Sequence, residues 1–111
     1  MWLIAKRGFY SILEKPEDRG EGLVTVRARV RQDIETLVDQ LEAGGFARPE
    51  IIPTPRADYK FRVRVPKAEL AAILAGMVMD IDYDNFKNTQ PQRAHIYGRV
   101  WSDLFELERG V

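Results

Sequence analysis

The sequence predicts an α+β fold in which helices cover one face of a four-stranded sheet, and three observations lead to this prediction. Segments 23–30 and 58–65 alternate apolar and polar residues with the period of two that is typical of a strand with one face in solvent. Segments 32–44 and 66–77 repeat apolar residues at helical spacing. The chain has 111 residues, the size of one domain, so we expect a single domain over residues 1–111.

The composition is that of a globular protein without cross-links. Hydrophobic residues make up 45% and charged residues 31% of the chain. The lack of cysteine excludes disulfides, thiolate metal sites and cysteine nucleophiles, and it suits the cytoplasm. Basic and acidic residues number 17 each. Because proteins that bind a phosphate backbone usually carry a basic surplus, this balance argues against nucleic acid as the default partner.

The hydrophobic residues are scattered in short runs. No run approaches the roughly 18 consecutive apolar residues that a membrane span needs. At the start of the chain the charged Lys6 and Arg7 follow a short apolar run, which is the reverse of a secretory signal. We therefore expect a cytoplasmic protein with no membrane partner.

The first strand region lies at residues 2–14, which are rich in aromatic and branched side chains. A Lys-Arg-Gly sequence at 6–8 interrupts it, so we expect either one long strand with a glycine bulge or two short strands in line. The polar, turn-forming stretch 16–22 then makes an exposed connection to the strand over 23–30.

The second half of the chain is less regular. Residues 46–57 hold three prolines and suit a loop or a short edge strand around Ile51 and Ile52. Past the helix that starts near Pro66, a polar segment leads to a last helix with an apolar stripe from Ile96 to Leu107.

The order of these elements suggests a topology. The first helix connects the strands over 23–30 and 58–65, and a strand–helix–strand crossover places its two strands parallel. The N-terminal strand pairs with 23–30 as a hairpin, and the weak strand near Ile52 flanks 58–65. This is a ferredoxin-like plait in circularly permuted order, with an extra C-terminal helix that covers a sheet edge or an apolar patch.

The two clear strands also predict a basic surface. If they are central neighbours, five cations share the open face of the sheet: Arg27, Arg29, Lys60, Arg62 and Arg64. Such a face suits an anionic ligand, a nucleic acid or an acidic protein. The alternative is a solvated strand face whose charges are neutralised by Glu14, Glu21, Asp58 or a partner subunit.

Aromatic residues would be needed for base stacking on that face. By their place in the alternation, Tyr59 and Phe61 are expected to point into the core, so these strands lack the stacking half of an RNA platform. Phe9 or Tyr10 could contribute one ring, depending on the register of the N-terminal strand.

An acidic run follows the second helix. Carboxylates at positions 80, 82 and 84 resemble the start of an EF-hand loop, but the sixth position is Asn85 instead of glycine and the twelfth is Pro91. We therefore predict no metal site. The aspartates are expected to turn the chain and to bind backbone amides.

His95 is the only histidine, and no neighbour in sequence completes a catalytic triad with it. A second candidate site, which would make the protein a small enzyme, combines it with the acidic run: Asp82, Tyr83, Asn85, Lys87 and His95. The alternative is a surface histidine and a structural joint between the last two helices. No glycine-rich phosphate loop is present, and no cofactor is predicted.

The last helix carries apolar residues on more than one face, including Tyr97, Trp101 and Phe105. A helix that packs only one face against the sheet would need fewer apolar residues. Either the helix is wedged between two elements of the monomer, or it forms part of a homodimer contact.

Several motifs, spread over nearly the whole chain, resemble a group of short, uncharacterised bacterial cytosolic proteins. They include the opening Met-Trp-Leu-Ile, Gly-Phe-Tyr-Ser at 8–11, and the Asp-Ile-Asp-Tyr-Asp-Asn-Phe-Lys run at 80–87. The resemblance implies a bacterial cytosolic origin and transfers no activity or functional residue. From the sequence we expect a binding module that uses the basic sheet face. The alternatives are the small enzyme and a purely structural, dimer-forming protein.

Overall fold

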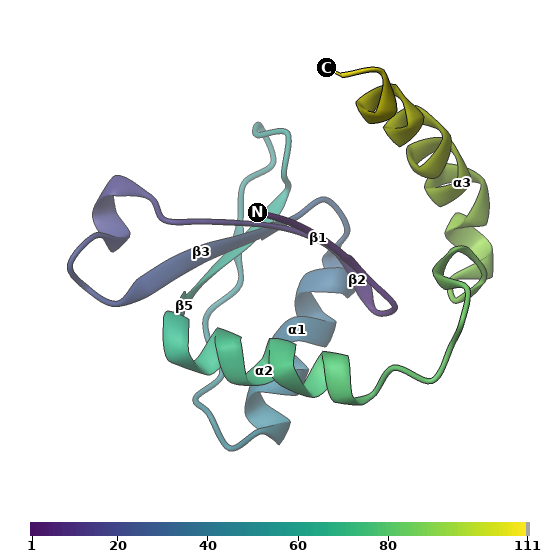
Figure 1. The fold of residues 1–111 in the computed structure, drawn as a ribbon. Coiled ribbons are helices and arrows are strands. Elements are labelled where there is room, and N and C mark those ends of the chain that lie inside the picture. The colour runs from purple at the N-terminus through teal and green to yellow at the C-terminus, as the bar shows by residue number, and fades with distance from the viewer. Residues whose placement is uncertain (111) are drawn as a thin grey trace. The chain divides into compact units, whose positions relative to one another are not determined.

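The computed structural model describes residues 1–110, and its contacts divide them into two units. The first unit is Met1–Ile81, and it contains the sheet and two helices (Figure 1). The second begins at Asp82 and is helical. Each unit is described by itself, and the single domain over 1–111 stays a prediction.

The sheet of the first unit is antiparallel throughout and has five strands in the order β1-β2-β3-β5-β4. The strands are β1 Trp2–Ala5, β2 Gly8–Leu13, β3 Leu23–Ala28, β4 Ile52–Pro53 and β5 Phe61–Pro66. The α+β class is confirmed. The predicted number of four strands is wrong, and the ferredoxin-like plait is not confirmed.

The additional strand comes from the N-terminal segment, which folds back on itself. Ala5 pairs with Gly8, so Lys6 and Arg7 form a two-residue turn between β1 and β2. Both expectations for residues 2–14, a bulged strand or two strands in line, are therefore wrong. The Lys-Arg-Gly sequence interrupts the strand pattern because the chain reverses there. The predicted hairpin between the N-terminal region and 23–30 is confirmed in the pairing of β2 with β3.

The strands β3 and β5 are neighbours, as predicted, but they run antiparallel. The parallel arrangement was wrong because the chain makes an additional extended pass before β5. This pass contains β4, which pairs antiparallel with β5 at the edge of the sheet, so β3 and β4 share one direction. The strand–helix–strand crossover therefore ends in β4, and β5 is inserted between its two strands.

Two helices pack on one face of the sheet, α1 Arg31–Ala43 and α2 Lys67–Met79 (Figure 1). The alternation in β3 and β5 turns Val24, Val26, Val63 and Val65 toward them, and these residues form the core with apolar residues of α1. Helix α1 contributes Ile34, Leu37, Val38 and Leu41 to this core. It ends at Gly44, and Gly45 takes a φ of 89°, which favours glycine. Helices on one face of the sheet are thus confirmed.

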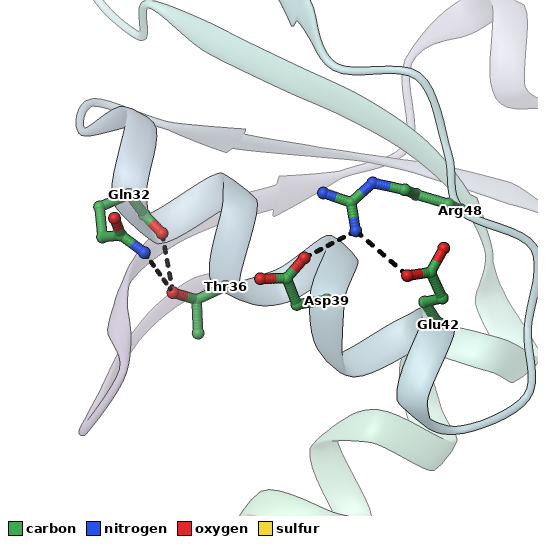
Figure 2. Close-up of polar contacts among 5 residues, drawn as sticks. All are labelled: Gln32, Thr36, Asp39, Glu42 and Arg48. Atoms are coloured by element: carbon green, nitrogen blue, oxygen red, sulfur yellow. Dashed lines mark hydrogen bonds and ion pairs between the residues drawn. The ribbon is translucent and has the colours of Figure 1, made fainter.

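A loop after α1 is tied back to the solvent side of that helix. Arg48 lies 2.6 Å from Asp39 and 3.7 Å from Glu42, and Figure 2 shows the three side chains together. On the same side of the helix the Thr36 hydroxyl donates to the Gln32 carbonyl at 2.8 Å. The charges on this side of α1 are therefore paired among themselves.

The second unit is a series of short helical segments around α3. They are η2 Phe86–Asn88, η3 Pro91–Arg93, α3 Ala94–Asp103 and η4 Leu104–Arg109. The predicted last helix is present, although its final turn is a 3-10 helix. Among the residues that the structure describes, no helix is long and apolar enough to cross a membrane.

Candidate anion-binding face

The register of the sheet aligns side chains on the face opposite the helices, which we call the open face. Ser11, Arg27 and Arg62 are partners across β2, β3 and β5. Two residues along, Thr25 is the partner of Arg64. Because successive side chains alternate between faces, these residues lie opposite the buried Val26 and Val63. Three of the five predicted cations, Arg27, Arg62 and Arg64, therefore share one face.

Arg64 is neutralised within the protein. Its Nε lies 2.8 Å from Asp18 Oδ1, and a second guanidinium nitrogen donates to the Glu17 carbonyl. Asp18 belongs to η1, Pro16–Asp18, in the connection between β2 and β3. The carboxylate also accepts from the Thr25 hydroxyl at 2.7 Å and from the Lys15 amide at 3.0 Å. Arg64 is thus part of a structural network rather than a ligand site.

The carboxyl group of Asp18 is fully buried, with 0% exposure. Burial by itself raises the pKa of a carboxyl, but the hydrogen bonds from Thr25, Lys15 and Arg64 outweigh it and lower the pKa of Asp18 below its ordinary value. The side chain is therefore ionised at neutral pH, and Arg64 neutralises its negative charge.

Lys60 is also occupied. Its Nζ donates to the carbonyls of Pro55 at 3.0 Å and Ala57 at 2.6 Å, so it closes the loop that precedes β5. Lys60 thus stabilises the loop that connects β4 and β5. Of the five predicted cations, only Arg64 has a carboxylate partner within residues 1–110. The three other arginines, Arg27, Arg29 and Arg62, make hydrogen bonds to neutral groups or none.

We call these three residues the arginine triad, and two of them pack on one aromatic ring. The guanidinium carbons of Arg27 and Arg29 lie 4.4 and 4.6 Å from the centre of the Tyr59 ring. Arg27 also donates to the Ser11 hydroxyl at 2.9 Å, and Arg29 donates to the Asp58 carbonyl at 3.0 Å. Both guanidinium groups are held in place by neutral partners, and each keeps its full charge.

The position of Tyr59 corrects a prediction. Tyr59 is 4% exposed, yet its ring contacts open-face arginines instead of the core. The strand alternation does not reach it, because β5 begins at Phe61 and the chain bends before it. Asp58 accepts from the Tyr59 amide and Thr54 donates to the Tyr59 carbonyl, which fixes the bend. Phe61 does pack against the core, as predicted.

Arg62 has no hydrogen bond or ion pair within residues 1–110. Its Nε is buried without a partner, and so is the Nε of Arg27, its direct neighbour on β3. A buried N–H without a partner costs about 1–3 kcal/mol of desolvation. The two guanidinium groups therefore hold like charges side by side, and an anion on the open face would neutralise them.

Two more aromatic rings continue the open face beyond Tyr59. Phe9 lies 6.3 Å from Tyr59 and 6.1 Å from Trp2, centre to centre. The Phe9 amide donates to the buried carboxylate of Asp33 at 3.0 Å, which anchors β2 to the start of α1. Of the two rings considered from the sequence, Phe9 lies on this face, whereas Tyr10 is in the core.

The second candidate set lies in the second unit, where its members make mostly structural contacts. Asn85 accepts from the Lys87 amide at the start of η2, and Lys87 Nζ lies 4.1 Å from the centre of the Trp101 ring. The Tyr83 ring packs on Phe86, which stacks on Tyr97.

His95 is exposed on α3, and Asp82 is also exposed. Within residues 1–110 no three His, Cys, Asp or Glu side chains are grouped as a metal site would need.

Sequence reasoning missed Trp2 and Asp18, and it placed Tyr59 on the wrong face. Trp2 could have been placed from the two-residue turn, since a hairpin closed at Lys6 and Arg7 puts Trp2 and Phe9 on the same face. Nothing in the sequence alone indicates the bend that turns the Tyr59 ring toward the arginines of the open face. Comparisons of the chain with protein-family models, curated proteins and solved structures gave no match.

Proposed function

We propose that this protein binds an anionic ligand through the arginine triad on its open sheet face. The supporting observation is the difference between neighbouring cations: Arg64 has the buried carboxylate of Asp18, whereas Arg27, Arg29 and Arg62 have no carboxylate. A fold that only needed solvated side chains on this face would not need to hold like charges side by side. The triad is the part of the predicted basic face that we propose for ligand binding.

The chemistry of the ligand follows from the donors. Guanidinium groups bind phosphates and carboxylates through paired N–H bonds, and they do so more strongly where water is partly excluded. Arg27 and Arg29 are already oriented by Tyr59, so little side-chain freedom is lost on binding. Arg62, the register partner of Arg27, adds the third positive charge of the triad.

Titration with a simple polyanion tests this proposal. Tripolyphosphate added to the ¹⁵N-labelled protein should shift the amide signals of β3 and β5, with an affinity that falls as salt rises. Arg62→Gln should weaken binding several-fold. Arg48→Gln is the matched control, because it removes the same charge from a loop that pairs with α1. Equal affinities of the two variants, or no binding by the wild type, would contradict the proposal.

We further propose that the protein acts in a bacterial cytoplasm and forms a homodimer. The absence of cysteine and the sequence resemblance support the first statement. Exposed apolar residues of α3 and η4, among them Trp101, Leu104 and Leu107 at 53–62% exposure, support the second. The exposed His95 gives the small-enzyme alternative no support, and we do not propose it.

A further inference from the structure

We infer that the anionic ligand is a single-stranded nucleic acid, with a base stacked on Trp2 and its phosphates at the arginine triad. This inference rests on the proposed function and adds the class of ligand. It starts from an observation that an anion site alone leaves unexplained: the open face continues from the arginines through Tyr59 and Phe9 to a tryptophan in solvent.

Trp2 is 75% exposed although it belongs to a paired strand. Its indole meets the Phe9 ring at 88°, an edge contact that leaves most of the indole surface uncovered. Phe9 is itself fixed by the hydrogen bond that its backbone amide donates to the Asp33 carboxylate. The exposed indole is therefore held on a rigid support, which lowers the entropy cost of stacking a planar group on it.

The side chains on this face match the two parts of a nucleotide. Guanidinium groups recognise the phosphate, and an exposed aromatic ring recognises the base. An inorganic anion or an acidic peptide would use the arginines but would have no need of Trp2. In a duplex the base faces are covered by one another, so a flat sheet face with an aromatic ring is suited to unpaired bases.

The zero net charge of the chain is compatible with this partner, because several other charges on the first unit are paired locally. Arg31 pairs with Glu35, Arg48 with Asp39, and Lys67 with Glu14. Three guanidinium groups without a carboxylate partner predict a modest dependence on salt. At about 0.7 counterions released per phosphate of a single strand, the slope of log affinity against log salt should be about −2.

Fluorescence anisotropy with the full chain tests the inference. The probes are labelled twelve-nucleotide oligothymidylate, oligouridylate, a twelve-base-pair duplex, and polyphosphate of matched length used as a competitor. Trp2→Ala should weaken oligothymidylate binding by roughly tenfold, because one stacked base is lost, and should leave polyphosphate competition unchanged. Trp2→Phe should restore most of the affinity. Trp101→Ala, which removes an exposed indole from α3, is the matched control.

The outcomes separate the inference from the proposed function. Arg62→Gln should weaken both the oligonucleotide and polyphosphate. If polyphosphate competes normally but Trp2→Ala leaves oligonucleotide affinity unchanged, the nucleic-acid inference is wrong and the anion site stands. Tighter binding of the duplex, or of oligoglutamate, than of either single strand would also overturn it. If no probe binds, both the nucleic-acid inference and the proposed anion site are wrong. Oligothymidylate and oligouridylate together show whether the strand is DNA, RNA or either.

Discussion

Arg27 and Arg62 lie directly opposite each other in the antiparallel pairing of β3 and β5, and each has a buried Nε without a hydrogen-bond partner. Two residues along β5, Arg64 has the reverse situation, with its Nε 2.8 Å from the buried carboxylate of Asp18. Arg62 and Arg64, on one strand and one face, thus differ in their contribution to the stability of the fold.

Replacing each of these arginines by glutamine should therefore change stability in opposite directions. Arg62→Gln removes a like-charge repulsion and should leave the free energy of unfolding unchanged or raise it by up to about 1 kcal/mol. Arg64→Gln leaves Asp18 buried without its charged partner and should lower the free energy of unfolding by about 1–3 kcal/mol. Urea denaturation at neutral pH and low salt measures both. Equal losses would mean that Arg62 has a structural role.

Acid should destabilise the protein through Asp18. The pKa of this carboxyl is lowered in the folded protein, despite burial, by the hydrogen bonds from Thr25, Lys15 and Arg64. The unfolded chain therefore binds the proton at higher pH than the folded one. The stability that Asp18 contributes is fully present above its unfolded pKa, near 3.8, and is lost as the pH falls through the lowered folded value.

Urea denaturation between neutral pH and about pH 3 measures this loss. Asp18→Asn should be less stable at neutral pH and should show a flatter decline in acid. Thr25→Val, which removes the 2.7 Å bond, should raise the folded pKa of Asp18 toward the unfolded value and make the acid-dependent loss of stability smaller. If Asp18→Asn lost stability in acid to the same extent as the wild type, the acid sensitivity would come from another carboxyl group.

The parts of the fold that followed from the sequence are those governed by local periodicity. Apolar residues at alternate positions from Val24 to Val30 identified β3, and the apolar spacing from Ile34 to Leu41 identified α1. The neighbouring positions of β3 and β5 followed from the same alternation. Their relative direction did not, because it depends on β4, a two-residue strand in a proline-rich loop whose sequence pattern is weak.

The candidate site was predictable only in part, for a related reason. Alternation placed Arg27, Arg62 and Arg64 on one face, but the choice between a free and a neutralised arginine depends on Asp18. This residue reaches the sheet from a 3-10 turn seven positions before Thr25. Tyr59 was misplaced because a two-residue period applies only within a paired strand, and the pairing of β5 with β3 starts at Phe61.

Gly8 should be intolerant of any side chain. A Cβ at this position would lie 2.7 Å from Asp33 Cγ and 2.8 Å from the Tyr10 hydroxyl. Gly8→Ala should therefore displace Asp33, break its bond to the Phe9 amide and lower the free energy of unfolding by about 1–3 kcal/mol. Thermal and urea denaturation, with amide exchange at Phe9, would measure the effect.

Gly76 provides the matched control for that substitution. It lies within α2, and a Cβ there would meet nothing within 4 Å. Gly76→Ala should raise the free energy of unfolding by about 0.5–1 kcal/mol, because alanine is the better helix former. Stabilisation by Gly8→Ala, or destabilisation by Gly76→Ala, would contradict the packing described for these sites.

Self-association should depend on the C-terminal helical segment. Leu104 and Leu107 are 54% and 62% exposed, and a second copy that covered them would remove this apolar surface from water. Light scattering of the wild type should give the mass of a dimer, and Leu104→Ser combined with Leu107→Ser should give a monomer with unchanged stability of the sheet. A wild-type monomer at high concentration would exclude the homodimer.

Tyr59 should stabilise the arginine triad through its ring rather than its hydroxyl. Its ring lies within 4.6 Å of both Arg27 and Arg29, so the aromatic face offsets part of the repulsion between these cations. Tyr59→Phe keeps the ring and should change neither stability nor anion affinity appreciably. Tyr59→Leu fills the space without a π face and should lower the free energy of unfolding by about 1–2 kcal/mol.

The Arg27 and Arg29 side-chain proton signals in NMR spectra provide a direct readout of this contact. Protons held over an aromatic face are shifted upfield, so the signals should keep their shifts in Tyr59→Phe and move toward random-coil values in Tyr59→Leu. Anion affinity should fall in parallel, since the guanidinium groups would no longer be held in position for the ligand. Unchanged affinity in Tyr59→Leu, with the arginine signals released, would show that orientation by the ring is not needed for binding.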